Sequence, residues 1–156
     1  MRIILAASGR WKSGKQTTPE RILYDHYASR IRFSLELREI EEKKNIDKKM
    51  LKKRESDLLF SQVPDGAVIV ALDQTGKPIK SMEFARKLEN WRDQGTKCVV
   101  FMIGGPDGLD ELVKKRAQFI MSLGNLTWPH LLVRGMLIEQ IFRAECILSG
   151  HPYHRE

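Results

Sequence analysis

Two uninterrupted apolar runs constrain the fold of this chain more than any other feature of its sequence. One is Ala-Val-Ile-Val-Ala-Leu at residues 67–72, and the other is Cys-Val-Val-Phe-Met-Ile at Cys98–Ile103. Neither run alternates apolar and polar residues, so a strand formed from either one buries both of its faces. Such strands are typical of the centre of a parallel sheet that helices cover on both sides. The two runs therefore predict an α/β fold.

The rest of the chain alternates between strand and helix patterns. A β-branched run at residues 2–7 predicts another strand, and the alternation at 35–40 predicts a half-exposed edge strand. Thr18 followed by Pro19 is a strong helix start, and Gly150 is placed to end the last helix. We expect a mostly parallel sheet with helices on both faces, in one domain over residues 1–156. The expected helices span residues 19–32, 47–60, 81–93, 109–121 and 129–148, with a turn-like segment at 122–128.

Length and apolar content exclude several classes of protein. The 156 residues fit one ordinary globular domain. The apolar runs of six residues or fewer are far shorter than the ~20 residues of a membrane helix. The start of the chain lacks the long apolar stretch of a signal peptide, so we expect a cytoplasmic protein. Cys98 and Cys146 lie inside apolar stretches and are expected to be buried thiols of a reducing compartment.

The charge of the chain favours a polyanionic partner. Lys and Arg number 27 against 20 acidic residues, which gives a net charge of +7 and a pI near 9.5. Such a balance favours nucleic acid, an anionic membrane surface or ribosomes. The most basic stretch, residues 41–55, has no interleaved aromatic residues, so it is more typical of a solvated helix face than of an RNA contact.

Two motif-like patterns do not hold up as sites. Residues 9–16 nearly match the phosphate-binding loop G-x-x-x-x-G-K-[ST], but Gln16 replaces the hydroxyl and the helix starts only after Thr18. His151 and His154 with His130 and Cys146 supply one short pair of metal ligands, whereas a zinc site uses two. We therefore predict neither a nucleotide triphosphatase nor a metal site.

Two glycine-containing loops are better candidates for ligand binding. The apolar strand that ends at Ile103 runs into Gly104 and Gly105, which let backbone approach a ligand closely. A second loop at residues 123–129 precedes a helix and places Leu123, Leu126 and Trp128 around free main-chain groups. In parallel sheets, ligands bind beyond the carboxyl ends of strands. The two loops suit a flat heterocycle held by main-chain hydrogen bonds and apolar walls.

The last helix and the residues after it form a third candidate region. The helix is apolar around nearly its whole circumference, so it is buried either in the core or against a partner, and it suggests a subunit interface. Glu139 and Arg143 stand four residues apart and are able to pair. The tail that follows contains Tyr153, His154 and Arg155, whose side chains suit base stacking, proton transfer and phosphate binding.

Several segments, in order along the chain, resemble one family. The sequence Ala-Leu-Asp-Gln-Thr-Gly-Lys stands at residues 71–77, Phe-Met-Ile-Gly-Gly-Pro-Asp-Gly-Leu at 101–109 and Ser-Leu-Gly-Asn-Leu-Thr-Trp-Pro-His at 122–130. Arg134, the stretch Leu-Ile-Glu-Gln-Ile-Phe-Arg-Ala at 137–144 and Gly-His-Pro-Tyr-His-Arg at 150–155 follow. Together they look like the bacterial large-subunit rRNA pseudouridine N3-methyltransferases, which are SPOUT methyltransferases.

This resemblance implies a fold, a cofactor and partners. The fold is an α/β knot, in which the C-terminal segment forms a trefoil knot. The enzymes of the family are homodimers, and their substrate is a pseudouridine of 23S rRNA in the large subunit or the whole ribosome, with no membrane or metal partner. The cofactor is S-adenosylmethionine, and the positions that carry over to its site are Leu72, Gly104, Gly105, Leu123, Gly124, Asn125, Leu126, Thr127 and Trp128.

The tail is where the resemblance and the residue types place the chemistry. His154 is the candidate base for the N3 proton, with Tyr153 as the alternative. Arg155 would hold a phosphate or the negative edge of the base, and Arg143 would orient the tail, contact RNA or only pair with Glu139. Two other functions stay open: a non-enzymatic ribosome-binding or assembly factor, and a related knotted methyltransferase that acts on tRNA.

Overall fold

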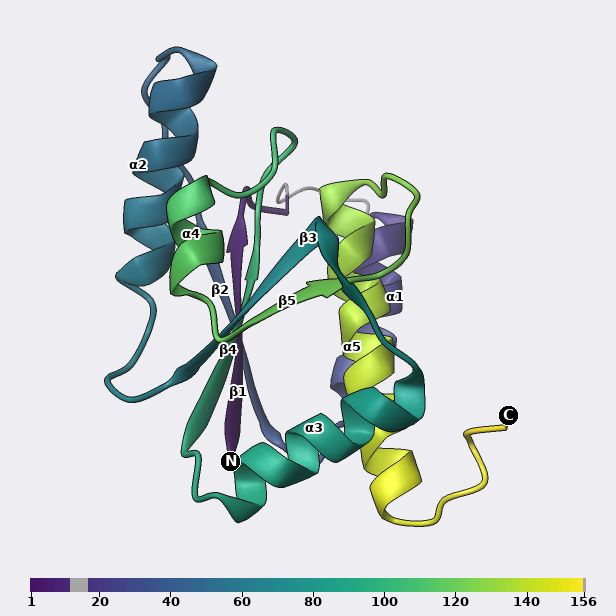
Figure 1. Ribbon diagram of the computed structural model, residues 1–156. Coiled ribbons are helices and arrows are strands. Elements are labelled where there is room, and N and C mark those ends of the chain that lie inside the picture. Colours follow the sequence, from purple (N-terminus) through teal and green to yellow (C-terminus); the bar gives the residue numbers. More distant parts are fainter. Residues whose placement is uncertain (12–16, 156) are drawn as a thin grey trace.

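Five parallel strands form one sheet at the centre of the molecule (Figure 1). The computed structural model describes residues 1–11 and 17–155. Neighbouring strands pair in parallel in the order β2-β1-β4-β3-β5. The prediction of an α/β fold with a parallel sheet is confirmed, and so is the edge position of the half-exposed strand. The strands are β1 (Arg2–Ser8), β2 (Ser34–Ile40), β3 (Val68–Pro78), β4 (Cys98–Ile103) and β5 (Phe119–Ser122).

Helices cover both faces of this sheet. One face packs against α1 (Pro19–Ala28), α3 (Ser81–Asp93) and α5 (His130–Leu148). The other face packs against α2 (Lys48–Phe60) and the short α4 (Glu111–Arg116). None of the helices in residues 1–11 and 17–155 is long and apolar enough to cross a membrane.

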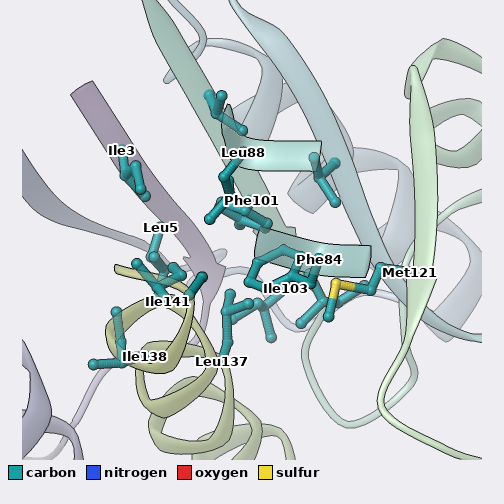
Figure 2. Packing of buried hydrophobic residues seen from close by; sticks show 14 of the residues in the cluster. Ile3, Leu5, Phe84, Leu88, Phe101, Ile103, Met121, Leu137, Ile138 and Ile141 are labelled. Atoms are coloured by element: carbon teal, nitrogen blue, oxygen red, sulfur yellow. The ribbon is translucent and has the colours of Figure 1, made fainter. Parts of the chain in front are cut away.

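Alternate side chains of each central strand enter different cores. In β1, Ile3 and Leu5 pack toward α5, while Ile4 and Ala6 pack on the opposite face. Figure 2 shows Leu137, Ile138 and Ile141 of α5 against the first of these cores. Burial on both faces explains why these strands read as continuous apolar runs.

The last helix is buried by its own chain. Ile138 is 0% exposed, and Leu137 and Ile141 are equally inaccessible in the single chain. The apolar circumference of α5 is therefore no argument for a subunit interface. Instead, α1, α3 and the sheet already surround most of it, and α1 packs so closely that a Cβ at Gly135 would lie 2.8 Å from Leu23.

Polar caps set the helix starts that the sequence predicted. Thr18 accepts a hydrogen bond from the Arg21 backbone N–H at 3.4 Å, and Asp47 accepts one from Met50 at 3.0 Å. Gly150 has a φ of +69°, a left-handed conformation typical of the residue that ends a helix. The first helix ends at Ala28, earlier than expected.

The helix predicted over residues 109–121 is wrong. Only Glu111–Arg116 is helical, and the chain then joins the sheet as β5. Gln118 causes the change, because its backbone N–H donates to the Ile69 carbonyl at 2.9 Å and its side chain accepts from the Ile69 N–H at 2.6 Å. β3 is also longer than predicted, with a register shift between Leu72 and Lys77 where it pairs with β5. The C-terminal knot stays a prediction.

Candidate functional site

A cavity of about 370 Å³ lies beyond the carboxyl ends of β3, β4 and β5. Its walls come from residues 72–75, where β3 shifts register, and from residues 103–109 and 121–128, which include the ends of β4 and β5 and the loops after them. Lys52 of α2, Lys114 of α4, and His130 and Val133 at the start of α5 complete the lining. This is the edge of a parallel sheet where ligands bind, and the volume is that of a small-molecule site.

The turn after β4 forms one wall, and its two glycines have different reasons to be there. A Cβ on Gly104 would lie 2.5 Å from the carbonyl carbon of Gly108, because the turn closes on itself. The Gly108 N–H donates to the Gly105 carbonyl at 2.9 Å. A Cβ on Gly105 would meet only the Glu55 carboxylate and Ser8 at ordinary distances of 3.5 and 3.6 Å. Backbone closure therefore requires glycine at 104 and not at 105.

The loop before α5 forms the opposite wall. Ser122 folds it, because its hydroxyl donates to the Gly124 carbonyl at 2.8 Å and accepts from the Gly124 N–H at 3.1 Å. Thr127 donates to the Gln74 side chain at 3.3 Å and so joins this loop to the exit of β3. Leu126 and Trp128 are 68% and 37% exposed, which leaves apolar side chains at the rim.

The structure brings together most of the residues assigned to the cofactor from the sequence. Asn125 is the exception, since it is exposed and does not line the cavity. Sequence reasoning passed over the polar lining residues, although Asp-Gln-Thr directly after an apolar strand end was a usable signal. The assigned residues that do line the cavity are Leu72, Gly104, Gly105, Leu123, Gly124, Leu126, Thr127 and Trp128. The polar residues that were missed are Lys52, Asp73, Gln74, Thr75, Asp107, Lys114 and His130.

Charges of both signs face this cavity. Burial alone would raise the pKa of Asp73, but hydrogen bonds from Thr75 and the nearby Lys114 and Lys52 ammonium groups hold that pKa below its usual value. The Lys114 ammonium lies 3.8 Å from the Asp73 carboxylate and also pairs with Glu111. Burial, with the Asp107 carboxylate nearby, raises the pKa of Glu55 behind the glycine turn. The cavity thus presents an ionised carboxylate beside ammonium groups.

A buried arginine anchors the cavity end of α5. Arg134 is 0% exposed, and its guanidinium donates to Glu39 at 2.6 Å and to the Ser8 and Gly9 carbonyls at 3.0 and 2.8 Å. Its guanidinium also lies 4.6 Å from the centre of the Trp11 ring. These contacts fix the helix that follows the second loop to the exits of β1 and β2. Most of the phosphate-loop-like stretch, residues 12–16, lies outside the described residues.

His130 is the imidazole in the cavity wall. Burial lowers its pKa, and the positive charge of Arg134 lowers it further. Both effects favour the neutral ring at physiological pH. The wall therefore contains a neutral imidazole that the sequence analysis considered only as a metal ligand. In residues 1–11 and 17–155, no three His, Cys, Asp or Glu side chains gather in a way that would hold a metal ion.

The tail lies at the other end of α5. Figure 1 shows the C-terminus on the side of the molecule away from the loops that follow the strands. The Tyr153 ring packs on Phe142 with centroids 4.9 Å apart, and its hydroxyl donates to the Glu139 carboxylate at 3.0 Å and lies 3.1 Å from the Tyr27 hydroxyl, from which it can accept a hydrogen bond. Tyr153 therefore packs against its own chain.

The three candidate catalytic residues of the tail have different surroundings. Burial and the hydrogen bonds to Tyr27 and Glu139 raise the pKa of Tyr153, so its hydroxyl stays protonated at neutral pH. His154 Nδ1 lies 3.4 Å from Arg143 Nη1, and Arg143 pairs with Glu139 as the sequence spacing allowed. Arg155 is exposed. In the single chain, none of the three lines the cavity.

A second hollow, of about 540 Å³, lies beside the tail. Arg30, Arg32 and Arg92 line it together with Glu145, which accepts hydrogen bonds from the Arg32 and Phe33 backbone N–H groups. The hollow is larger than the first cavity, but it lies at the wrong end of the sheet for a strand-exit site. No glycine turn contributes to its lining, so the features expected for a heterocycle belong to the first cavity.

Comparison with known proteins gives a consistent result. The family model for predicted SPOUT methyltransferases matches residues 1–154. The chain is 50% identical to the ribosomal RNA large subunit methyltransferase H of Rhodospirillum centenum over 155 residues, which is 99% of each chain. The proteins of the same name from Paramagnetospirillum magneticum and Rhodospirillum rubrum are 46% and 45% identical to it, again over 99% of each chain.

Proposed function

The chain belongs to the SPOUT methyltransferase family, as its sequence motifs predicted, and on that premise we propose that it methylates N3 of a pseudouridine in 23S rRNA. The observation that carries the proposal is the cavity at the strand ends, whose walls are the two loops that the family resemblance assigns to a cofactor. The relatives named as large subunit methyltransferases support rRNA as the substrate. We expect the enzyme to act in the cytoplasm, where ribosomes are.

The lining of the cavity fits S-adenosylmethionine. Main-chain groups of residues 104–108 and 123–128, with apolar Leu72 and Leu126 beside them, suit the flat adenine ring. The ionised Asp73 carboxylate suits the positive charges of this ligand, and the Lys52 and Lys114 ammonium groups suit its carboxylate. When bound, S-adenosylmethionine supplies an electrophilic methyl group.

The protein then has two tasks. Its cavity walls must hold N3 of the base against that methyl group, since positioning contributes most when the reagent is already reactive. A side chain must also accept the N3 proton. Within one chain His130 is the neutral imidazole of the cavity, whereas His154, our candidate base, follows the far end of α5.

We therefore propose that a second copy of the chain supplies the tail. The 19 residues of α5 span about 28 Å at 1.5 Å per residue, which separates His154 and Arg155 from the cavity of their own chain. In a homodimer, the tail of one protomer would meet the cavity of its partner. The exposed Leu126 and Trp128, which line the cavity, are apolar side chains that such a partner would cover. Arg155 would then contact the RNA, and Arg143 would hold the tail in place.

Methyl transfer to ribosomal substrates tests this function. Labelled methyl transfer is measured to whole ribosomes, separated large subunits and naked 23S rRNA, and incorporation at N3 of a pseudouridine is the expected result. Calorimetry with S-adenosylmethionine separates the enzyme from a non-enzymatic ribosome-binding factor, which has no use for this cavity. Transfer to tRNA instead would favour the related knotted methyltransferases.

Subunit mixing tests the shared site. A Gly104→Val protomer has a damaged cavity and an intact tail, and a His154→Ala protomer has the reverse. If the tail acts across the dimer, co-expression restores about a quarter of wild-type activity, because half of the dimers are mixed and each has one complete site. If each chain uses its own tail, the mixture stays as inactive as either variant.

A further inference from the structure

The positive charge of the chain is concentrated in one short segment. Residues 43–54 contain seven Lys and Arg residues against one acidic residue, Asp47. This segment therefore holds +6 of the net +7 of the whole chain, and the remainder is close to neutral. Most of the segment forms the amino-terminal half of α2.

This half of α2 stands beside the cavity. Figure 1 shows it rising past the carboxyl ends of the strands. The Lys48 ammonium lies 3.3 Å from the Asp107 carboxylate in the turn after β4, and Lys52 lines the cavity itself. At the other end of α2, the Phe60 ring lies 3.9 Å from the Arg116 guanidinium of α4. The basic segment is thus fixed at the rim of the cavity.

The basic side chains on α2 are largely unneutralised. Among the described residues, Lys49, Lys52, Lys53 and Arg54 make no ion pair, although Lys49 and Lys53 stand four residues apart and repel each other. Asp47 accepts a hydrogen bond from the Met50 N–H as the helix cap.

Other helices of the protein pair several of their arginines with acidic side chains. Arg21 pairs with Asp25 on α1 at 2.9 Å, and Arg143 pairs with Glu139 on α5. On α3, Arg92 lies 3.5 Å from Glu89. Among the described residues, Arg86 of α3 and Arg116 of α4 also make no ion pair, but α2 gathers four unpaired cations between residues 49 and 54. Such clustering is expected where a surface binds an anion from outside.

We propose that Lys49, Lys53 and Arg54, which we call the basic ridge, bind the phosphate backbone of the rRNA that flanks the target nucleotide. The inference rests on the proposed function, because a base that enters the cavity carries its neighbouring phosphates across the rim. Lysine binds phosphate as a point charge without stacking, which fits a ridge that has no aromatic residue. Lys52 connects the ridge to the cavity wall.

Neutralising the ridge tests the proposal. The variant Lys49→Ala/Lys53→Ala is compared with the control Arg86→Ala/Lys97→Ala, which removes two exposed positive charges from α3 and the segment before β4. Ribosome affinity is measured between low and physiological salt. We expect the ridge variant to bind about tenfold more weakly and to lose one to two units of the log–log salt slope, as the loss of about two phosphate contacts predicts. The control should change less than about twofold, and both should keep wild-type affinity for S-adenosylmethionine.

Four results would overturn the proposal. In the first, the ridge and control variants lose the same affinity, so that only total charge matters. In the second, a photo-crosslinker at position 53 captures ribosomal protein and no rRNA. In the third, the wild-type chain binds S-adenosylmethionine but neither binds nor methylates ribosomes, and the proposed function then fails together with this inference. In the fourth, the wild type is active and the ridge variant keeps wild-type ribosome affinity and salt dependence. That result rejects this inference and leaves the proposed function standing.

Discussion

The cavity at the strand ends and the C-terminal tail both hold residues that the sequence marked as functional, but the fold treats them differently. The cavity is assembled from three loops of one chain, and backbone geometry at Gly104 and Gly124 defines it. The tail places Tyr153 against Phe142 and Tyr27, at the far end of the same helix. The cavity that we propose for the cofactor is thus built by one chain alone, whereas the proposed proton acceptor depends on where a helix ends and what lies opposite it.

The largest effect that separates the two regions is expected for His154→Ala. If His154 accepts the N3 proton, methyl transfer falls by ~10²–10⁴-fold and recovers in part at high pH, where N3 ionises unaided. The melting temperature and the affinity for S-adenosylmethionine stay near wild type, because the ring does not line the cavity. Single-turnover assays on ribosomes check this. A similar loss with His130→Ala alone would move the base into the cavity wall.

Arg134→Leu should produce the largest loss of stability at the cavity end. It removes a buried guanidinium and leaves Glu39 and the Ser8 and Gly9 carbonyls without their donor. Breaking a buried ion pair in this way costs about 3–5 kcal/mol of unfolding free energy. The matched control is Arg21→Leu, whose exposed pair with Asp25 contributes about 0–1 kcal/mol. Urea unfolding measures both, and equal losses would contradict a special role for Arg134.

The two neighbouring glycines of the β4 turn give a smaller but sharper contrast. In Gly104→Ala the new Cβ meets the Gly108 backbone, so the turn must shift and the Kd for S-adenosylmethionine should rise at least tenfold, or ~1.4 kcal/mol. In Gly105→Ala the Cβ meets Glu55 and Ser8 at ordinary distances, and the Kd should stay within about twofold. Calorimetry measures the Kd for S-adenosylmethionine in both variants. Equal increases in Kd would mean that both glycines face the ligand.

The variant Tyr153→Phe measures how strongly the Tyr153 hydroxyl holds the tail to its own chain. The variant keeps the ring against Phe142 and loses only the hydroxyl contacts to Glu139 and Tyr27. We expect a loss of about 1 kcal/mol in unfolding free energy, typical of such hydrogen bonds. Methyl transfer should decline mildly, since the hydroxyl is not the base. A collapse of activity as large as that of His154→Ala would instead show that the hydroxyl takes part in the reaction.

The smallest effect concerns pH and the imidazole of the cavity. The fold lowers the pKa of His130 below its unfolded value of 6.5, so the unfolded chain binds more protons near that pH. Stability contributed by the neutral ring is present above pH 6.5 and is lost as the pH falls toward the folded pKa. His130→Gln should therefore lose less unfolding free energy than wild type between pH 7.5 and about 5.5. Identical pH profiles would place His130 in solvent.

The parts of this molecule that the sequence predicted are those where local rules decide. A strand formed from a continuous apolar run must bury both of its faces. The sequence therefore predicted β3 and β4 at the centre of the sheet, where the structure has them. Thr18 and Asp47 carry their own capping chemistry. Gly104 and Gly105 were found because they follow β4 directly, and the loop at residues 123–128 was found because it precedes the last helix.

Features set by partners distant in sequence were missed. Residues 109–121 have apolar spacing that suits a helix, and only the pairing of Gln118 with Ile69 turns their end into a strand. Arg134 reads as a surface residue of a helix until Glu39 and the β1 carbonyls surround it. Tyr153 contacts Tyr27 across a sequence separation of 126 residues, and no local sequence pattern predicts this contact.

The large sequence separation between contacting residues also has a consequence for the synthesis of the protein. Arg134 hydrogen-bonds carbonyls that were synthesised 126 and 125 residues earlier, so the first strand emerges long before the helix that closes its exit. Contacts between such distant segments form slowly, because the intervening chain must be ordered before they contribute. A nascent chain that has not yet passed residue 130 lacks the helix that anchors the cavity. A protein proposed to modify ribosomes would therefore complete the cavity proposed for its cofactor only when nearly all of it has left the ribosome that made it.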